Sequence, residues 1–529
     1  MISLALAQIS NGIGNISHRI RKILSIATEA RINGASMVIT PELSLCGCIP
    51  NESFIHDSFI SACRDGLDWL CEHLPTDLAV VVGLPLHDAV NSSVVIINHR
   101  VVHTVRKFDA IRQRHCYKEY MESPSIFLWE GYRILLTMEV DESCDTSNCD
   151  IVIAIKNHQF QIDHNLEPKI KTLSDKKRIP FIHLNGTGSQ DNLIFKGGSV
   201  GYNPDGTCAI KLPCFKECTQ IVTIRDKNII PQKLPKCFSS PEEEIVCALK
   251  SSLIDYCNQH EFSEVVIGLS GGIDSSLVLC IASDALGANS CHGLILPSRF
   301  NRKTSMSDAQ NLANELGCRT TTLSIEPMLE CYESHLKITS GIAHENLQSR
   351  IRAQIIMAYS NEKNALVINT SNKSERAIGY NTMYGDSIGG IALIGDLFKS
   401  EVYSLARWYR NTKGAISETI LEKPPSAELR PNQKDSDSIP DYDILERVIR
   451  AYLKTGSPPT DIPEDLSNSI LIKFHQSEHK RRQFPTVPTI SSGPTLAWSW
   501  PTHWTNAAEH SKEQLPKQQT HSNYQHNRT

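Results

Sequence analysis

The stretch Glu264–Ser276, EVVIGLSGGIDSS, constrains the fold of this chain more than any other. Residues 265–269 form a short run of apolar, mostly β-branched side chains, which predicts a buried parallel strand. The Ser-Gly-Gly turn at 270–272 interrupts this run, and an apolar-periodic segment then continues to Gly287, which predicts a helix. A strand, a glycine turn and a helix N-terminus bring backbone N–H groups and partial positive charge together. The sequence therefore predicts an anion-binding loop here.

The side chains of this loop add polar groups that suit a phosphate. Ser270, Ser275 and Ser276 can donate hydrogen bonds from their hydroxyl groups. Asp274 would repel a bare phosphate, but it suits a phosphate that arrives with Mg²⁺. The chain contains no GxxxxGKS or GxxxxGKT motif, so this is not a Walker A loop. An ordinary strand-to-helix turn is the alternative interpretation of SGG alone, and the full run SGGIDSS favours a phosphate site.

Strands and helices alternate after this loop. Short apolar runs predict strands at residues 294–297, 321–325 and 365–369. Helical periodicity predicts helices at 241–258, 305–317 and 343–360, and a largely helical region at 437–478. Such alternation predicts a doubly wound parallel sheet, whose ligands bind beyond the carboxyl ends of the strands.

The first half is richer in strands and has fewer predicted helices. Apolar runs predict a series of short strands between residues 2 and 202, so we expect a layered α/β sandwich. Residues 226–240 are polar, contain two prolines and lack periodicity, which predicts a linker. We therefore divide the chain into a domain at 1–225, this linker, a second domain at 241–506 and a disordered tail at 507–529.

Composition limits the class of protein. A chain of 529 residues with 40% hydrophobic and 21% charged residues has material for two or three soluble domains. The formal net charge of −5 gives no basic stripe, so nucleic acid is not an expected partner. No apolar run reaches the ~20 residues of a membrane span, and the start lacks the basic region of a signal peptide, so no membrane partner is expected. The 17 cysteines include no CxxC pair, so we expect reduced thiols in a cytoplasmic protein.

Polar side chains gather where the predicted sheet would present its binding edge. Asn346 and Arg350 are spaced i, i+4 on one face of a predicted helix, for which a solvated face is the alternative interpretation. Thr370 and Glu375 closely follow a predicted strand and would lie beside the glycine loop. Lys399 stands at a helix start, where an ammonium group is poorly placed for the helix dipole but well placed for a phosphate.

Taken together, these stretches resemble the synthetase domain of the NAD synthetase family. The resemblance covers about residues 241–500 and rests on SGGIDSS, PSRF, SMSDA, ENLQSRIR, TSNKSE, GYNTMYGD, DLFKSEVY, PSAELRPNQKD and HKRRQ, in this order. It implies a doubly wound ATP pyrophosphatase domain, in which ATP adenylates the nicotinate carboxylate of deamido-NAD⁺ and ammonia then displaces AMP to give NAD⁺. Because the family assembles as homo-oligomers, the resemblance implies a homo-oligomer here.

The resemblance also implies roles for individual residues. It assigns ATP binding to Gly268, Leu269, Ser270, Gly271, Gly272, Ile273, Asp274, Ser275, Thr370 and Lys399. It assigns deamido-NAD⁺ binding to Asn346, Arg350, Glu375 and Lys480, and Mg²⁺ binding to Asp274 and Glu375. We therefore expect Asp274→Ala to abolish adenylation and to leave the fold intact, because the side chain would face Mg²⁺ and not the core.

The residue types suit this chemistry. A carboxylate is inert to ammonia until its oxygen becomes a good leaving group, which adenylation achieves. Loop N–H groups, Mg²⁺ and Lys399 would supply positive potential while negative charge develops at phosphorus. Loops that close over the site would exclude the water that otherwise hydrolyses the acyl-adenylate.

The first half resembles the nitrilase-like glutaminase domain that is fused to many NAD synthetases. The resemblance rests on ITPELSLCG at 39–47 and NGTGSQDNLIFKGGS at 185–199, and it implies an αββα sandwich. That family uses a Glu as base, a Lys to stabilise the oxyanion and a Cys as nucleophile. Glu42 matches the base, and Lys107 is the best match for the lysine, with Lys118 as the alternative.

The nucleophile is where this chain departs from the glutaminase pattern. Family members carry Cys-Glu-Asp at the end of the corresponding strand, and here these positions are Met138, Glu139 and Val140. A methionine thioether has no ionisable proton and cannot form the acyl-enzyme. The turn that usually contacts glutamine is also altered, at residues 157–159. Cys144 lies six residues beyond Met138 in a loop, where an incidental thiol is the simpler interpretation.

The sequence therefore predicts an enzyme of the NAD synthetase family that takes ammonia, free or from a partner, because its glutaminase lacks a thiolate. Three alternatives stay open. They are a fully glutamine-dependent enzyme with a displaced or unconventional nucleophile, a nitrilase-type amidohydrolase, and a non-catalytic scaffold. Met138 argues against the amidohydrolase, and the intact motifs of the second half argue against the scaffold.

Overall fold

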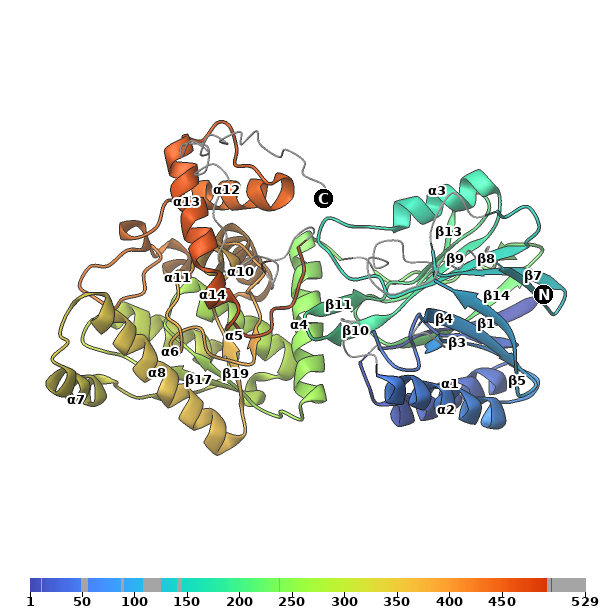
Figure 1. Ribbon diagram of the computed structural model, residues 1–529, viewed down its shortest axis with the longest axis horizontal. Coiled ribbons are helices and arrows are strands. Elements are labelled where there is room, and N and C mark those ends of the chain that lie inside the picture. The colour runs from blue at the N-terminus through green and yellow to red at the C-terminus, as the bar shows by residue number, and fades with distance from the viewer. Residues whose placement is uncertain are drawn as a thin grey trace, which may run out of the picture.

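The computed structural model describes residues 1–10, 12–48, 56–86, 90–107, 125–139, 145–236, 238–491 and 496. Figure 1 shows two lobes, with the first half of the chain on one side, the second half on the other, and the long helix α4 (Pro241–Gln259) between them. The predicted tail at 507–529 lies outside the described residues. In the described part of the chain, no helix is both long and apolar enough to cross a membrane.

The first lobe contains two sheets packed face to face. In spatial order, the first sheet consists of β15 (Asn228–Ile229), β14 (Cys218–Arg225), β1 (Ile2–Gln8), β2 (Met37–Ile39), β3 (Ala79–Leu86), β4 (Val90–Ile97) and β5 (Arg100–Arg106). The second consists of β13 (Cys208–Lys211), β12 (Val200–Tyr202), β9 (Phe181–Asn185), β8 (Ile151–Lys156), β7 (Tyr132–Thr137) and β6 (Ser125–Trp129).

Helices cover the outer faces of both sheets. The helices α1 (Ile16–Ile32) and α2 (Asp57–His73) pack on the first sheet, and α3 (Glu167–Lys177) packs on the second. Strand β1 shows how the sequence specifies these layers, because Leu4 and Leu6 face the second sheet whereas Ala5 and Ala7 face the helices. The predicted αββα sandwich is therefore confirmed.

The second lobe has a fully parallel sheet with helices on both faces. Its strands, in spatial order, are β18 (Arg319–Thr322), β17 (Cys291–Ile295), β16 (Val265–Gly268), β19 (Leu366–Asn369) and β20 (Ile391–Ala392). One face is packed by α4, α5 (Ile273–Leu286), α6 (Lys303–Leu316) and α10 (Lys399–Lys413), and the other by α7 (Glu326–Leu336) and α8 (Gly341–Lys363). The predicted doubly wound fold is confirmed.

Further helices complete this lobe beside the sheet. They are η3 (Ala288–Ser290), α9 (Lys373–Ile378), α11 (Glu418–Glu422), η4 (Asp435–Asp437), α12 (Tyr442–Thr455), α13 (Glu464–Gln476) and α14 (Glu478–Arg481). Most of the apolar side chains of α12 and α13 form a separate core with those of α9. The prediction of a largely helical region at 437–478 is confirmed.

Two predictions about local structure differ from the fold. The predicted strand at 321–325 is β18 at Arg319–Thr322, because Pro327 stands in the first turn of α7 and the chain already turns toward that helix. Strand β15 lies inside the predicted linker at 226–240 and pairs with β14, so the first sheet extends to Ile229.

The lobes are joined by packed contacts. The hairpin of β10 (Thr187–Gln190) and β11 (Leu193–Lys196) projects from the first lobe onto α4. Phe160 and Ile194 of the first lobe belong to the same apolar core as α4 and α5. Near the C-terminal end of the described chain, Ile490 accepts a hydrogen bond from the backbone of Ile162 at 2.9 Å.

Candidate active site

The glycine loop joins β16 to α5 with the tight backbone turn that its sequence predicts. Gly271 has φ +73°, and a Cβ on it would lie 1.9 Å from the carbonyl oxygen of Ser305, so only glycine fits. The hydroxyl groups of Ser270 and Ser275 lie 3.1 Å apart across the turn. Because the first N–H groups of a helix have no partner within it, the N-terminus of α5 offers donors for an anion here.

A cavity of about 300 Å³ opens at this loop. It is lined by seven of the eight predicted loop residues, all except Gly271, and by Thr370, Glu375 and Lys399. Residues that the sequence analysis did not single out also line it, among them Arg352, Asp386, Tyr403, Lys423 and Asp435. The cavity lies at the carboxyl ends of β16, β17 and β19, as expected for a doubly wound sheet.

Lys399 holds the acidic side chains of the cavity together. Its Nζ lies 2.5 Å from Oδ2 of Asp274 and 3.5 Å from Oε1 of Glu375, and its side chain is only 3% exposed. Asn372, the N-cap of α9, donates a hydrogen bond to Oδ1 of Asp274 at 2.9 Å. Asp274 lines the cavity as expected and is also the counter-ion of a buried lysine, so Asp274→Ala would leave Lys399 without this partner.

The pKa shifts indicate that the acidic side chains around Lys399 bring more negative charge than this one lysine can neutralise. Burial raises the pKa of the Glu375 carboxyl to about 8 against the opposing effect of Lys399, and Asp274 and Asp435 add to the rise. Burial also raises the pKa of Asp435. For Lys399, burial favours the neutral form, but Asp274 and Glu375 outweigh it and raise its pKa. Three carboxyl groups surround one ammonium group, so their combined negative charge could be balanced by a further cation.

The acidic pair Asp274 and Glu375 could help to hold that cation. The described residues contain no group of three or more His, Cys, Asp or Glu side chains that could hold a metal ion without other ligands. Mg²⁺ that binds with a nucleotide uses only one or two protein carboxylates, because phosphate and water supply the remaining ligands. Asp274 and Glu375 line the same cavity beside the phosphate loop, so they fit this partial ligand set.

The remaining predicted residues of the second half do not line the cavity but hold a loop next to it. Asn346 accepts a hydrogen bond from Thr382 at 2.8 Å, and Nε of Arg350 donates to the carbonyl oxygen of Met383 at 3.2 Å. Nζ of Lys480 donates to two carbonyl groups of the same loop, each at 2.7 Å, those of Gly379 and Asn381. All three therefore fix the loop that carries Asp386 into the cavity.

The first lobe brings Glu42 and Lys107 together, as the sequence predicts. Nζ of Lys107 lies 2.6 Å from Oε1 of Glu42, whose side chain is 4% exposed. Asn91 donates to the same carboxylate oxygen at 2.5 Å, and the backbone N–H of Asn157 donates to Oε2 at 3.0 Å. Both carboxylate oxygens of Glu42 thus have partners within the protein.

Met138 follows β7 directly and is buried, at 2% exposure, in the apolar core between the two sheets. Beside it, Glu139 forms an ion pair with Lys156 at 2.8 Å. Lys118 and Cys144, the two alternatives weighed from the sequence, lie outside the described residues. Cys46 is the described thiol nearest to Glu42 in sequence, and contact with Cys63 together with burial raises its pKa well above its usual value. A buried thiol of this kind is a poor nucleophile.

Comparison with known proteins places the chain in a family. Its residues 245–484 match the family model described as NAD synthase. Over 91% of this chain and 95% of the relative, it is 34% identical to a glutamine-dependent NAD(+) synthetase of Synechocystis sp.. It is 32% identical to the enzyme of that name from Aquifex aeolicus, over 93% of this chain and 97% of the relative. The chain belongs to the glutamine-dependent NAD(+) synthetase family.

A solved structure agrees with this NAD(+) synthetase assignment across both lobes. A glutamine-dependent NAD⁺ synthetase from Acinetobacter baumannii in complex with ADP covers 93% of this chain, with 96% of its own length, a TM-score of 0.74 and 26% identity. A second such synthetase, from Cytophaga hutchinsonii, has a TM-score of 0.77 at 20% identity, with coverage of 96% and 98%, and supports the fold.

Proposed function

We propose that this chain is an ATP-dependent NAD(+) synthetase whose working nitrogen donor is ammonia. The observation that carries the choice of donor is Met138, a buried thioether at the position where the resemblance implies the glutaminase cysteine. Release of ammonia from glutamine by the covalent route needs a thiolate to attack the amide, and no thioether can do so.

In the first reaction step, the carboxylate of deamido-NAD⁺ attacks the α-phosphorus of ATP and pyrophosphate leaves. The loop at 268–275 would bind the phosphates through its helix-end N–H groups and serine hydroxyls, and Thr370 would bind the nucleotide from the next strand. Lys399 would place positive charge near the departing phosphates from a fixed position, because it is buried and held by Asp274.

Asp274 and Glu375 would hold Mg²⁺ together with the phosphates. The bound ion would neutralise charge that develops on the phosphate oxygens. Glu375 must lose its proton to become a ligand, and its pKa of about 8 places that loss close to neutral pH. Nucleotide binding with Mg²⁺ would therefore release a proton from this side chain.

In the second step, ammonia attacks the acyl carbon and AMP leaves. This step needs a site from which water is excluded, because water would hydrolyse the same intermediate. Asn346, Arg350 and Lys480 support this step through the loop at 379–386, which they fix beside the cavity. We propose that these three residues help to bind deamido-NAD⁺, either by direct contact or by holding this loop against it.

We further propose that the protein works in the cytoplasm as a homo-oligomer. The cysteines of the described residues are all free thiols, which suits a reducing compartment. Family membership supports the oligomer, and the first lobe, which has lost its nucleophile, would then serve as structure.

The runner-up is a fully glutamine-dependent enzyme with an unconventional nucleophile. The intact Glu42–Lys107 pair favours it, since a base and an oxyanion donor have been kept at 2.6 Å. Two observations argue against it: the Glu42 carboxylate already accepts hydrogen bonds within the protein, and the Cys46 thiol is buried with a raised pKa. The second lobe contains a charged cavity lined by the predicted ATP-binding residues, which argues against the amidohydrolase and scaffold hypotheses.

A comparison of nitrogen donors tests the proposal. Purified protein with ATP, Mg²⁺ and deamido-NAD⁺ is given either ammonium chloride or glutamine labelled with ¹⁵N at the amide. We expect NAD⁺ with ammonia and less than about one-hundredth of that kcat/KM with glutamine, with no transfer of ¹⁵N. Glu42→Gln is the matched control, because it should leave the ammonia reaction unchanged. Labelled NAD⁺ formed from glutamine as efficiently as from ammonia, and lost in Glu42→Gln, would establish the runner-up.

A further inference from the structure

Helix α8 presents one stripe of side chains to the synthetase cavity. Ser349, Arg352, Ala353 and Ile356 all line it, and their spacing of i, i+3, i+4 and i+7 places them on one helix face. Arg352 is the one charged residue among these four. Arg350, which the family resemblance singles out, is exposed and points to the loop at 379–386 instead.

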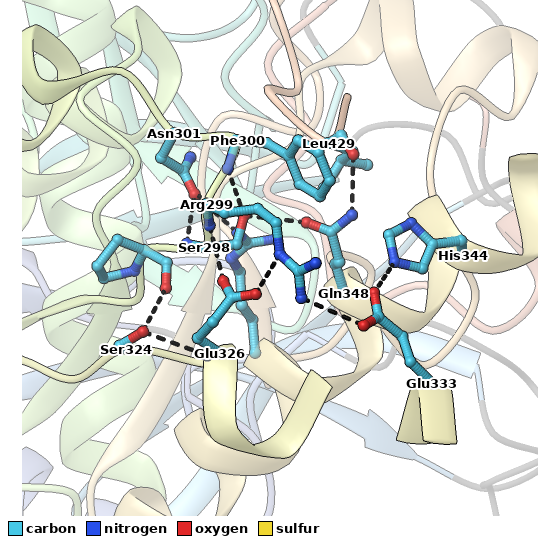
Figure 2. A network of polar contacts seen from close by, with 12 residues as sticks. Ser298, Arg299, Phe300, Asn301, Ser324, Glu326, Glu333, His344, Gln348 and Leu429 are labelled. Atoms are coloured by element: carbon cyan, nitrogen blue, oxygen red, sulfur yellow. Dashed lines mark hydrogen bonds and ion pairs between the residues drawn. The ribbon is translucent and has the colours of Figure 1, made fainter. Parts of the chain in front are cut away.

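The polar partners of Arg352 are neutral. Its Nε donates to the carbonyl oxygen of Leu296 at 2.9 Å, and its Nη2 donates to Oδ1 of Asn301 at 2.9 Å. Among the described residues, no acidic side chain forms an ion pair with it. Figure 2 shows the contrast within the same loop, where Arg299, two residues before Asn301, is bound by both Glu326 and Glu333.

The other cations that line the cavity have counter-ions. Lys399 pairs with Asp274 at 2.5 Å, and Lys423 pairs with Asp308 at 2.6 Å. Burial lowers the pKa of Arg352 to about 10, so its guanidinium group is still charged at neutral pH. A partly buried charge without an ion-pair partner is energetically unfavourable. Glu428 and Glu326 attract this charge, but among the described residues neither forms an ion pair with it, so the guanidinium group has no direct counter-ion there.

We propose that Arg352 is a substrate-binding residue, whose guanidinium group pairs with an anionic oxygen of a bound substrate. The proposal rests on the proposed function for the two anions available, the phosphates of ATP and the carboxylate of deamido-NAD⁺. Both present paired oxygens that match the planar fork of arginine. The fork is held in place, because Leu296 and Asn301 accept hydrogen bonds from its Nε and Nη2, and the Asn301 side chain is in turn bonded by Ser298 and Glu428.

Pairs of ligands that differ by one charged group distinguish the ATP phosphates from the deamido-NAD⁺ carboxylate as the anion that Arg352 binds. ATP against adenosine measures recognition of phosphate, and deamido-NAD⁺ against NAD⁺ measures recognition of the carboxylate. Arg352→Gln removes the charge and keeps a planar polar group, whereas Arg352→Lys keeps the charge and removes the fork. We expect Arg352→Gln to lower one of the two affinity ratios by about tenfold or more in calorimetric titrations, because a charge-assisted contact is lost. Arg352→Lys should lower the same ratio by roughly threefold.

Arg447→Gln is the matched control, because it removes an exposed arginine that pairs with Asp461 outside the cavity. It should leave both ratios as in the wild type. An active protein in which Arg352→Gln keeps the wild-type unfolding temperature and both ratios would overturn the proposal and leave the proposed function standing. If Arg352→Gln does not fold, unchanged ratios in Arg352→Lys would overturn it equally. If the wild-type protein forms no NAD⁺, both the proposed function and the role of Arg352 are wrong.

Discussion

Glu375 is the residue whose protonation ties the site to the stability of the fold. Its pKa of about 8 lies above the ordinary 4.5, so the folded protein holds a proton that the unfolded chain releases between these values. The stabilising contribution is therefore complete below pH 4.5 and is lost as pH rises toward 8. We expect Glu375→Gln, which is neutral throughout, to gain stability relative to the ligand-free wild type as pH rises from 5 to 8. Urea unfolding at several pH values measures this, and a constant difference would contradict it.

Motif reasoning identified the glycine loop and several residues that reach the cavity from later elements, but it did not identify every charged residue of the cavity. Asp274, Glu375 and Lys399 were predicted individually, and the structure places them within one ion-pair cluster. Arg352 was not assigned a role although it ends the motif ENLQSRIR, and Lys423 lies outside the quoted motifs. An arginine on a helix rich in polar residues looks solvated until the fold shows which face is covered.

At the scale of elements, the connection from β16 to α5 depends on glycine at one position. Gly271→Ala would place a Cβ 1.9 Å from the Ser305 oxygen at φ +73°, so the loop must move away from the start of α6. We expect a loss of ATP affinity of at least about tenfold in calorimetry, since the loop N–H groups would no longer converge. Gly287→Ala is the control, because it has φ +85° and nothing within 4 Å. Equal affinities in the two variants would show that steric fit at 271 is unimportant.

The buried strand after 264 and the long helix before 361 were predictable, whereas several polar or short elements were not. The strand at 265–269 and the long helix at 343–360 correspond to β16 and α8. Helix α3 was missed because its sequence, EPKIKTLSDKK, buries only Ile170, Leu173 and Ser174. Strand β15 was taken for linker because a two-residue strand depends on pairing with β14, which local sequence does not encode.

At the scale of the whole molecule, a series of polar contacts connects the first lobe to helix α9 beside the synthetase cavity. Asp396 accepts hydrogen bonds from the backbone of Ile490 and Ser491 at 2.9 and 2.8 Å, and it pairs with buried Lys373 at 2.8 Å. Lys373 is the first residue of α9, which carries Glu375. Because Ile490 also bonds to Ile162 of the first lobe, the first lobe contributes to the placement of the cavity.

This shared packing predicts that the lobes unfold together. Phe160 belongs to the first lobe but is buried, at 4% exposure, in the core of the second. We expect the wild type to show one calorimetric transition. Phe160→Ala, which should cost about 3–5 kcal/mol at the junction, should split it into two. Phe181→Ala removes an equally buried phenyl ring from the first lobe's own core, so it should lower the transition without splitting it. Two transitions already present in the wild type would mean that the junction does not couple the lobes, and that the synthetase site is stable without support from the first lobe.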